Sequence, residues 1–131
     1  MSTQKQNEYL LLFRGSQWDK GLSVEQLQKA MDQFRGWFER LQKEGTVKAG
    51  QPLEREGRIV TRSTVADGPF AESKEAIGGY FLVHADTLDQ AVAIARQSPV
   101  LQYGGSVEVR PVAEECPTFR RVKEQLAAVA A

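Results

Sequence analysis

A run of consecutive apolar residues near the start of the chain constrains the fold more than any other feature. Residues 9–13 (Tyr-Leu-Leu-Leu-Phe) are all apolar, which is typical of a strand that is covered on both faces. Residues 79–85 predict a second strand, with Phe81 and Val83 on one face and Tyr80, Leu82 and His84 on the other. We therefore expect a sheet that needs a cover on each side.

Helical patterns follow both strands. Ser23 is the expected N-cap of the first helix, Gln26 completes a capping box, and Gly45 suits the position just beyond the helix. The residues between them that share one apolar stripe are Leu27, Ala30, Met31, Phe34, Phe38 and Leu41. A second, shorter helix is expected after a cap at Asp86 or Thr87.

Turn signals divide the rest of the chain into further elements. Strands are expected at residues 46–53, 58–65 and 106–112, and a short helical turn at 71–77. The order β-α-β, an inserted strand and β-α-β predicts an α+β fold. It is a ferredoxin-like split βαβ repeat with an antiparallel sheet and both helices on one face. A second copy of the chain would then cover the other face, so we expect a homodimer.

The length of 131 residues favours a single domain. We expect this domain to occupy residues 1–115. Residues 116–131 would form a helical tail with Pro117 in its first turn and Phe119, Val122 and Leu126 on one side.

Composition excludes several classes of function. The chain has 17 basic and 17 acidic residues without a basic face, so nucleic acid is not an expected partner. Cys116 is the only cysteine, which rules out a disulfide within the chain and a cysteine metal cluster. The first residues are polar and no apolar run approaches the roughly 20 residues of a membrane span. These features predict a soluble, cytoplasmic protein with no membrane partner.

The residues around position 70 carry a motif that composition does not explain. It reads Asp67-Gly68-Pro69-Phe70-Ala71-Glu72, then Lys74-Glu75, then Gly78-Gly79-Tyr80-Phe81-Leu82. Further matches stand at residues 9–12, 49–53, 88–91, 99 and 105–112. Together they resemble the YCII-related family, and within it the branch named for its Asp-Gly-Pro-Phe motif, over residues 8–112.

The resemblance implies a dimeric α+β barrel, in which two ferredoxin-like sheets pack face to face. It also implies a suspected enzyme without an assigned substrate, and a functional link to an alternative sigma factor. Some relatives carry a histidine in the first helix, paired with an aspartate. This chain has Phe34, Trp37 and Phe38 in that helix instead.

The motif loop offers the first candidate site residues. Asp67 is a candidate general base or substrate anchor, because it stands where a strand ends. The alternative is turn chemistry, since an aspartate before Gly-Pro bonds backbone amides and holds the bend. Glu72, with Lys74 and Glu75, offers acid–base chemistry, or else belongs to a solvated helix face.

His84 is the only histidine and therefore the natural proton carrier near neutral pH. Tyr80 lies on the same face of its strand and could assist. One histidine and one cysteine do not suit a tight zinc site, so no metal and no cofactor are expected.

Arg14, Arg62 and Arg110 fall in or beside expected strands. An arginine pointing into a cavity would hold a carboxylate or phenolate ligand. The alternative is that these arginines pair with the acidic residues Glu8, Asp19 or Glu108.

These residues suggest a hypothesis with two branches. In the first, a cavity binds a small, aromatic or anionic metabolite, and proton transfer without a cofactor catalyses an elimination or isomerisation. Asp67 would be the base, an arginine would hold the anion, and Tyr80 or His84 would assist. In the second branch the protein only senses a ligand or binds a partner linked to a transcriptional regulator.

Overall fold

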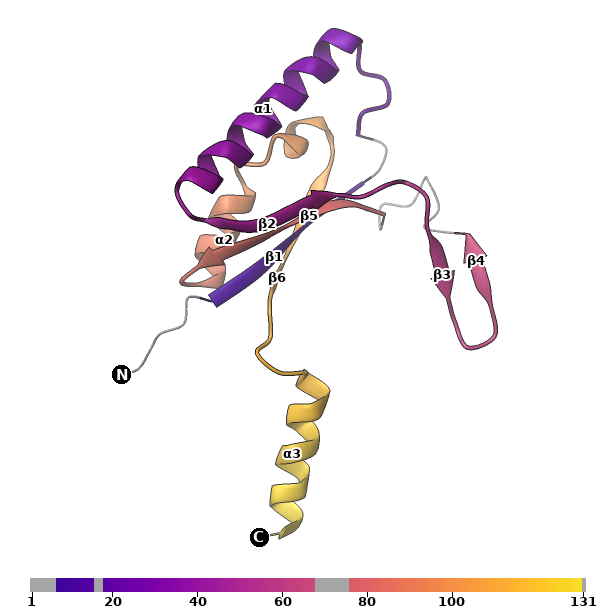
Figure 1. Ribbon diagram of the computed structural model, residues 1–131, viewed down its shortest axis with the longest axis vertical. Helices are drawn as coiled ribbons and strands as arrows, with labels where there is room; N and C mark the ends of the chain where they lie inside the picture. Colours follow the sequence, from indigo (N-terminus) through magenta and orange to yellow (C-terminus); the bar gives the residue numbers. More distant parts are fainter. Residues whose placement is uncertain (1–6, 16–17, 68–75, 131) are drawn as a thin grey trace.

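A four-stranded antiparallel sheet with two helices on one face forms the body of the protein (Figure 1). The computed structural model describes residues 7–15, 18–67 and 76–130. The sheet has the order β2-β5-β1-β6. Its strands are β1 (Asn7–Arg14), β2 (Val47–Pro52), β5 (Ile77–Ala85) and β6 (Ser106–Pro111). This is the strand order of a ferredoxin-like split βαβ repeat, so the predicted α+β fold is confirmed.

The first helix, α1 (Val24–Lys43), begins as predicted. The Ser23 side chain accepts a hydrogen bond from the backbone N–H of Gln26, and the Gln26 side chain accepts one from the backbone N–H of Ser23. At the other end Gly45 has a φ of +75°, which favours glycine. The capping box and the terminal glycine therefore set both ends of α1.

The second helix, α2 (Leu88–Ala95), has Thr87 as its N-cap, as predicted. A short 3-10 helix, η1 (Pro99–Tyr103), follows it. Ser98 caps η1, and Pro99, which lies beyond the end of α2, occupies the first turn of η1.

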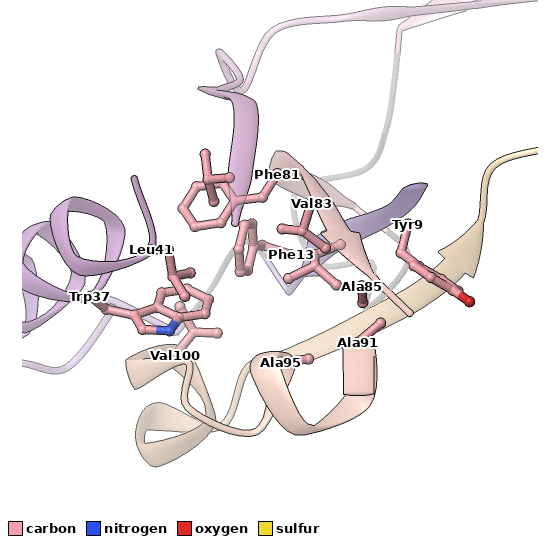
Figure 2. Packing of buried hydrophobic residues seen from close by; sticks show 12 residues of the cluster. Tyr9, Phe13, Trp37, Leu41, Phe81, Val83, Ala85, Ala91, Ala95 and Val100 are labelled. Atoms are coloured by element: carbon pink, nitrogen blue, oxygen red, sulfur yellow. The ribbon is translucent and has the colours of Figure 1, made fainter. Parts of the chain in front are cut away.

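The hydrophobic core lies between the helices and one face of the sheet (Figure 2). Phe81 is its centre, with ring centroids 4.9 Å from Phe13 and 5.2 Å from Trp37. Such edge-to-face and tilted aromatic pairs add to the free energy of burial. Trp37 is 3% exposed, whereas Met31 is exposed, so the apolar stripe of α1 is rotated toward Trp37 relative to the prediction.

No helix in the described part of the chain lies over the opposite face of the sheet (Figure 1). Along β1 and β5, Tyr9, Leu11, Phe81 and Val83 are buried, and the residues between them are only half-buried. These alternate residues on the uncovered face are Glu8, Leu10, Leu12, Arg14, Tyr80, Leu82 and His84. The prediction that Phe81 and Val83 lie on one face of the strand and Tyr80, Leu82 and His84 on the other is confirmed.

Residues 58–65 were predicted as one strand, and that prediction is wrong. They contain a turn between two short strands, β3 (Arg58–Val60) and β4 (Val65–Asp67), which pair only with each other. In the turn the N–H of Thr61 donates to the Thr64 carbonyl at 2.8 Å, and their hydroxyls are 2.6 Å apart. The β3–β4 hairpin stands clear of the main sheet (Figure 1).

The last helix, α3 (Pro117–Ala130), confirms the predicted helical tail and its proline at the first position. Every described residue of α3 is exposed. Figure 1 places α3 clear of the sheet, on the side away from α1. Among the helices described, none is long and apolar enough to cross a membrane.

Candidate functional site

An open hollow of about 600 Å³ lies at the end of the sheet where β1 begins and β5 ends. It opens on the uncovered face. Its lining comes from three strands and from the segment that follows β6: Asn7, Glu8, Lys48, His84, Val112, Ala113 and Glu114. Of these, Glu8, Lys48, His84 and Glu114 carry titratable groups, so the hollow is polar at its rim.

Strand register brings the titratable groups of the hollow together. Glu8 and His84 are direct partners across β1 and β5, which places their β-carbons about 5 Å apart. Lys48 of β2 donates from Nζ to Glu8 Oε2 at 2.8 Å. The register between β2 and β5 shifts between Val47 and Ala49. Three strands therefore each contribute one group to the hollow: a carboxylate from β1, an ammonium from β2 and an imidazole from β5.

The imidazole of His84 is held so that one nitrogen is enclosed. Its Nδ1 is buried and has no hydrogen-bond partner among the described residues. The residue as a whole is only half-buried and lines the hollow. A ligand in the hollow can therefore reach the part of the side chain that is not enclosed. Because a neutral imidazole both donates and accepts, the ring can pass a proton to a ligand there.

A second charged group lies farther along the uncovered face. Arg14 Nη1 of β1 donates to Glu108 Oε1 of β6. Arg110 lies 3.6 Å from the other oxygen of Glu108. The carboxylate of Glu108 thus pairs with both arginines, as the ion-pairing alternative predicted for this pair of strands. One carboxylate balances only one of the two positive charges, so the exposed Arg110 keeps N–H donors that a ligand carboxylate could use.

Asp67 is the last residue of β4 in the β3–β4 hairpin, which lies far from His84. Its side chain is 91% exposed, and its Oδ1 is 3.3 Å from Nε of Arg58. Arg62 lies in the turn of the same hairpin and is also exposed. The hairpin joins the sheet near Gly78, at the end of β5 opposite to His84 (Figure 1). Within one copy, Asp67 and His84 do not meet.

The structure brings together only part of the predicted set. His84 lies in the hollow, and Tyr80 shares its face of β5. Glu72 lies outside the described residues. Lys48 and Glu114 were not predicted, and Glu8 was considered only as an ion-pair partner. The register of β1 against β5 and the irregularity in β2 are the signals that locate them, and neither is readable from one strand alone.

Two other features complete the local chemistry. Among the residues that the structure describes, no three histidine, cysteine, aspartate or glutamate side chains are grouped to hold a metal ion. Cys116, directly before α3, is exposed, and hydrogen bonds from the backbone of Phe119 and Thr118 lower the pKa of its thiol.

Comparison with known proteins agrees with this fold. Residues 8–115 match the model of the YCII-related domain. An uncharacterized protein of Rhizobium meliloti (strain 1021) is 48% identical over 50 residues, which are 37% of this chain and 40% of that protein. The match thus spans less than half of that relative's own length. Because the domain match covers most of the chain, the protein is a member of the YCII-related family.

Proposed function

We propose that the hollow around His84 binds a small anionic metabolite, aromatic or aliphatic, and that His84 transfers a proton on it. The observation that carries this proposal is the half-buried imidazole. Its Nδ1 is enclosed, and the residue lines a hollow that Lys48 and Glu8 also line. Histidine is the side chain whose ordinary pKa suits proton transfer near neutral pH.

The neighbouring residues have distinct roles in this proposal. The ammonium of Lys48 is held at the rim by its hydrogen bond to Glu8, and because an ammonium has three N–H donors it can donate a further hydrogen bond to the ligand's anionic group. His84 takes a proton from a carbon beside the anionic group and returns it at another carbon. The product then contains the same atoms as the substrate, and no cofactor is needed. An elimination would use the same first step and release a leaving group.

We further propose that two copies pack through the uncovered faces of their sheets. Leu10, Leu12, Tyr80 and Leu82 form an apolar band there that no element described in the chain covers. Apolar bands of this kind mark interaction surfaces. The Asp67–Phe70 motif supports a finer placement of the chain in the branch named for that motif.

The single histidine makes the proposal directly testable by NMR. In untagged protein with ¹³C-labelled histidine, every imidazole signal belongs to His84. We expect benzoate to shift these signals saturably, whereas benzamide, which has the same ring without the charge, has little effect. In the Lys48→Gln variant benzoate should bind at least tenfold more weakly, a loss of about 1.4 kcal/mol.

The matched control is Lys29→Gln, which removes the same charge from an exposed position of α1. It should bind benzoate as the wild type does. If benzoate and benzamide move the His84 signals equally, or if both lysine variants weaken binding alike, the anion site is not at the hollow. Native mass spectrometry of the purified protein would show any ligand that is retained through purification.

A further inference from the structure

The C-terminal helix α3 carries an apolar face that nothing in its own chain covers. Four residues of this face recur at helical spacing and form what we call the α3 stripe: Phe119, Val122, Leu126 and Val129. Their exposed fractions run from 46% for Val122 to 84% for Val129. The opposite side of the helix carries Arg121, Glu124 and Ala128. The helix is therefore amphipathic in an orientation that exposes its apolar side.

A helix of this length is not expected to persist in water without a packing surface. Isolated helices shorter than about 12–15 residues are marginal even when rich in alanine, and α3 has 14 residues. Its local contacts stabilise only the beginning, where Lys123 Nζ is 2.9 Å from Glu115 Oε2 and lies 5.4 Å from the centre of the Phe119 ring. The stripe must be buried elsewhere.

We infer that the α3 stripe docks on a second copy of this chain and so forms the outer part of the homodimer. This inference rests on the face-to-face dimer proposed above. The helix follows β6 and lies beyond the end of that strand, away from α1 and clear of its own sheet, where it is free to reach a second copy (Figure 1). In the dimer the α3 stripe and the apolar band of the sheet would then both contact the partner.

The area of the sheet face supports the same partner. Four strands spaced about 4.8 Å apart, each of six to nine residues, give a face of about 400–500 Å². A stable interface of standard size buries about 800 Å² on each partner. A 14-residue helix is about 21 Å long and about 10 Å wide, so its stripe covers about 200 Å². Each copy supplies one stripe and receives another, which brings the total near the standard size.

Docking of α3 would also complete the hollow. Ala113 and Glu114, which line it, belong to the short segment that joins β6 to α3. A helix anchored on the partner holds this segment in place, so Glu114 stays beside His84. In a free chain the hydrogen bond from the Val112 N–H to the Glu8 carbonyl, 2.9 Å long, ties the start of this segment to the sheet.

Sedimentation of the full-length chain tests the inference with a matched pair of variants. Leu126→Arg places a charge in the α3 stripe, and Ala128→Arg places the same side chain on the opposite side of the helix. Because arginine is a good helix former, neither change should unwind α3. We expect Leu126→Arg to raise the dimer dissociation constant at least tenfold and Ala128→Arg to change it less than twofold. Equal dissociation constants for wild type and both variants would overturn the inference.

A second measurement on the wild type identifies the surface that the stripe covers. In an equal mixture of ¹³C-labelled and unlabelled chains, isotope-filtered NOEs report only contacts between copies. We expect such NOEs from the methyl groups of Val122 and Leu126. If NOEs between copies are absent while an unfiltered spectrum shows these methyl groups against β-strand residues, α3 folds back on its own sheet. The absence of both kinds of NOE would leave α3 free for some other partner, and either result refutes docking on a second copy.

The ligand site at the hollow and the docking of α3 have separate readouts. The benzoate titration follows His84, and neither Leu126 nor Ala128 lines the hollow. Loss of the benzoate response with intact NOEs between copies would refute the proposed function alone. The reverse result would refute the docking of α3 alone.

Discussion

At the scale of single residues, Gly79 is required by the close approach of two strands. Its backbone φ is not positive, but an added Cβ would lie 2.9 Å from the Gln51 carbonyl oxygen and 3.2 Å from Cα of Pro52. An added Cβ at Gly78 meets nothing nearer than 3.9 Å. Of these two neighbouring glycines, Gly79 is therefore the one at a close backbone approach.

The variants Gly78→Ala and Gly79→Ala should therefore differ clearly in their free energy of unfolding. We expect Gly79→Ala to destabilise the fold by about 1 kcal/mol or more, because the backbone of β2 must move away. Gly78→Ala should be neutral or slightly stabilising, since it reduces the freedom of the unfolded chain. Urea unfolding curves of both variants measure this difference. Identical midpoints would show that β2 yields at no cost.

Asp67 is the residue whose candidate role the structure changes most. Its side chain is almost wholly exposed and forms an exposed ion pair with Arg58, so replacing Asp67 should alter stability little. We expect Asp67→Asn to leave the melting temperature within a degree or two of wild type. The benzoate response of His84 should be unchanged. A tenfold loss of benzoate affinity would instead show that the hairpin of one copy reaches the hollow of the other.

At the scale of elements, α1 shows how directly a local motif fixes a boundary. The Ser23→Ala variant loses the side-chain oxygen that accepts from Gln26 and should destabilise the fold by about 1 kcal/mol. Ser23→Asp keeps a capping oxygen and should restore most of that loss. Thermal unfolding monitored by circular dichroism compares them. If alanine and aspartate behave alike, the cap contributes nothing to stability.

The same scale explains what the sequence could and could not predict. The apolar runs of β1 and β5 and the capped pattern of α1 are local features. The sequence therefore predicts the type and position of these elements, and from them the fold class. The β3–β4 hairpin was not, because its turn at Thr61–Thr64 contains neither glycine nor proline and the strand-like pattern continues through it.

His84 could be named because it is unique in the chain, but its neighbours could not. Whether Lys48 shares the face of His84 depends on the register shift in β2, and Glu114 arrives from the segment beyond β6. Both placements are set by long-range pairing, which a single strand does not encode. Met31 was misplaced for a related reason: the large indole of Trp37 took the inner side of α1.

At the scale of the whole molecule, the uncovered sheet face should control assembly. Leu82 lies near the middle of the apolar band, opposite Leu10 in β1. We expect Leu82→Arg to yield monomers, because a buried, unpaired charge would disfavour the interface. Gln42→Arg introduces the same side chain at an exposed position of α1 and should leave the dimer intact.

Sedimentation velocity across a range of concentrations distinguishes these variants. Dimers of Leu82→Arg as stable as the wild type would place the interface elsewhere. A folded, monomeric wild type would refute the dimer itself, and with it the docking of α3.

The strand order also has a consequence for synthesis of the chain on the ribosome. β1 emerges first, yet its neighbours in the sheet are β5 and β6, with Tyr9 opposite Val83 about 70 residues later. At about 5–20 residues per second, the apolar segment around Leu11 waits several seconds for a strand to pair with. During that time it can bind a chaperone or the nascent segment of a neighbouring polysome chain.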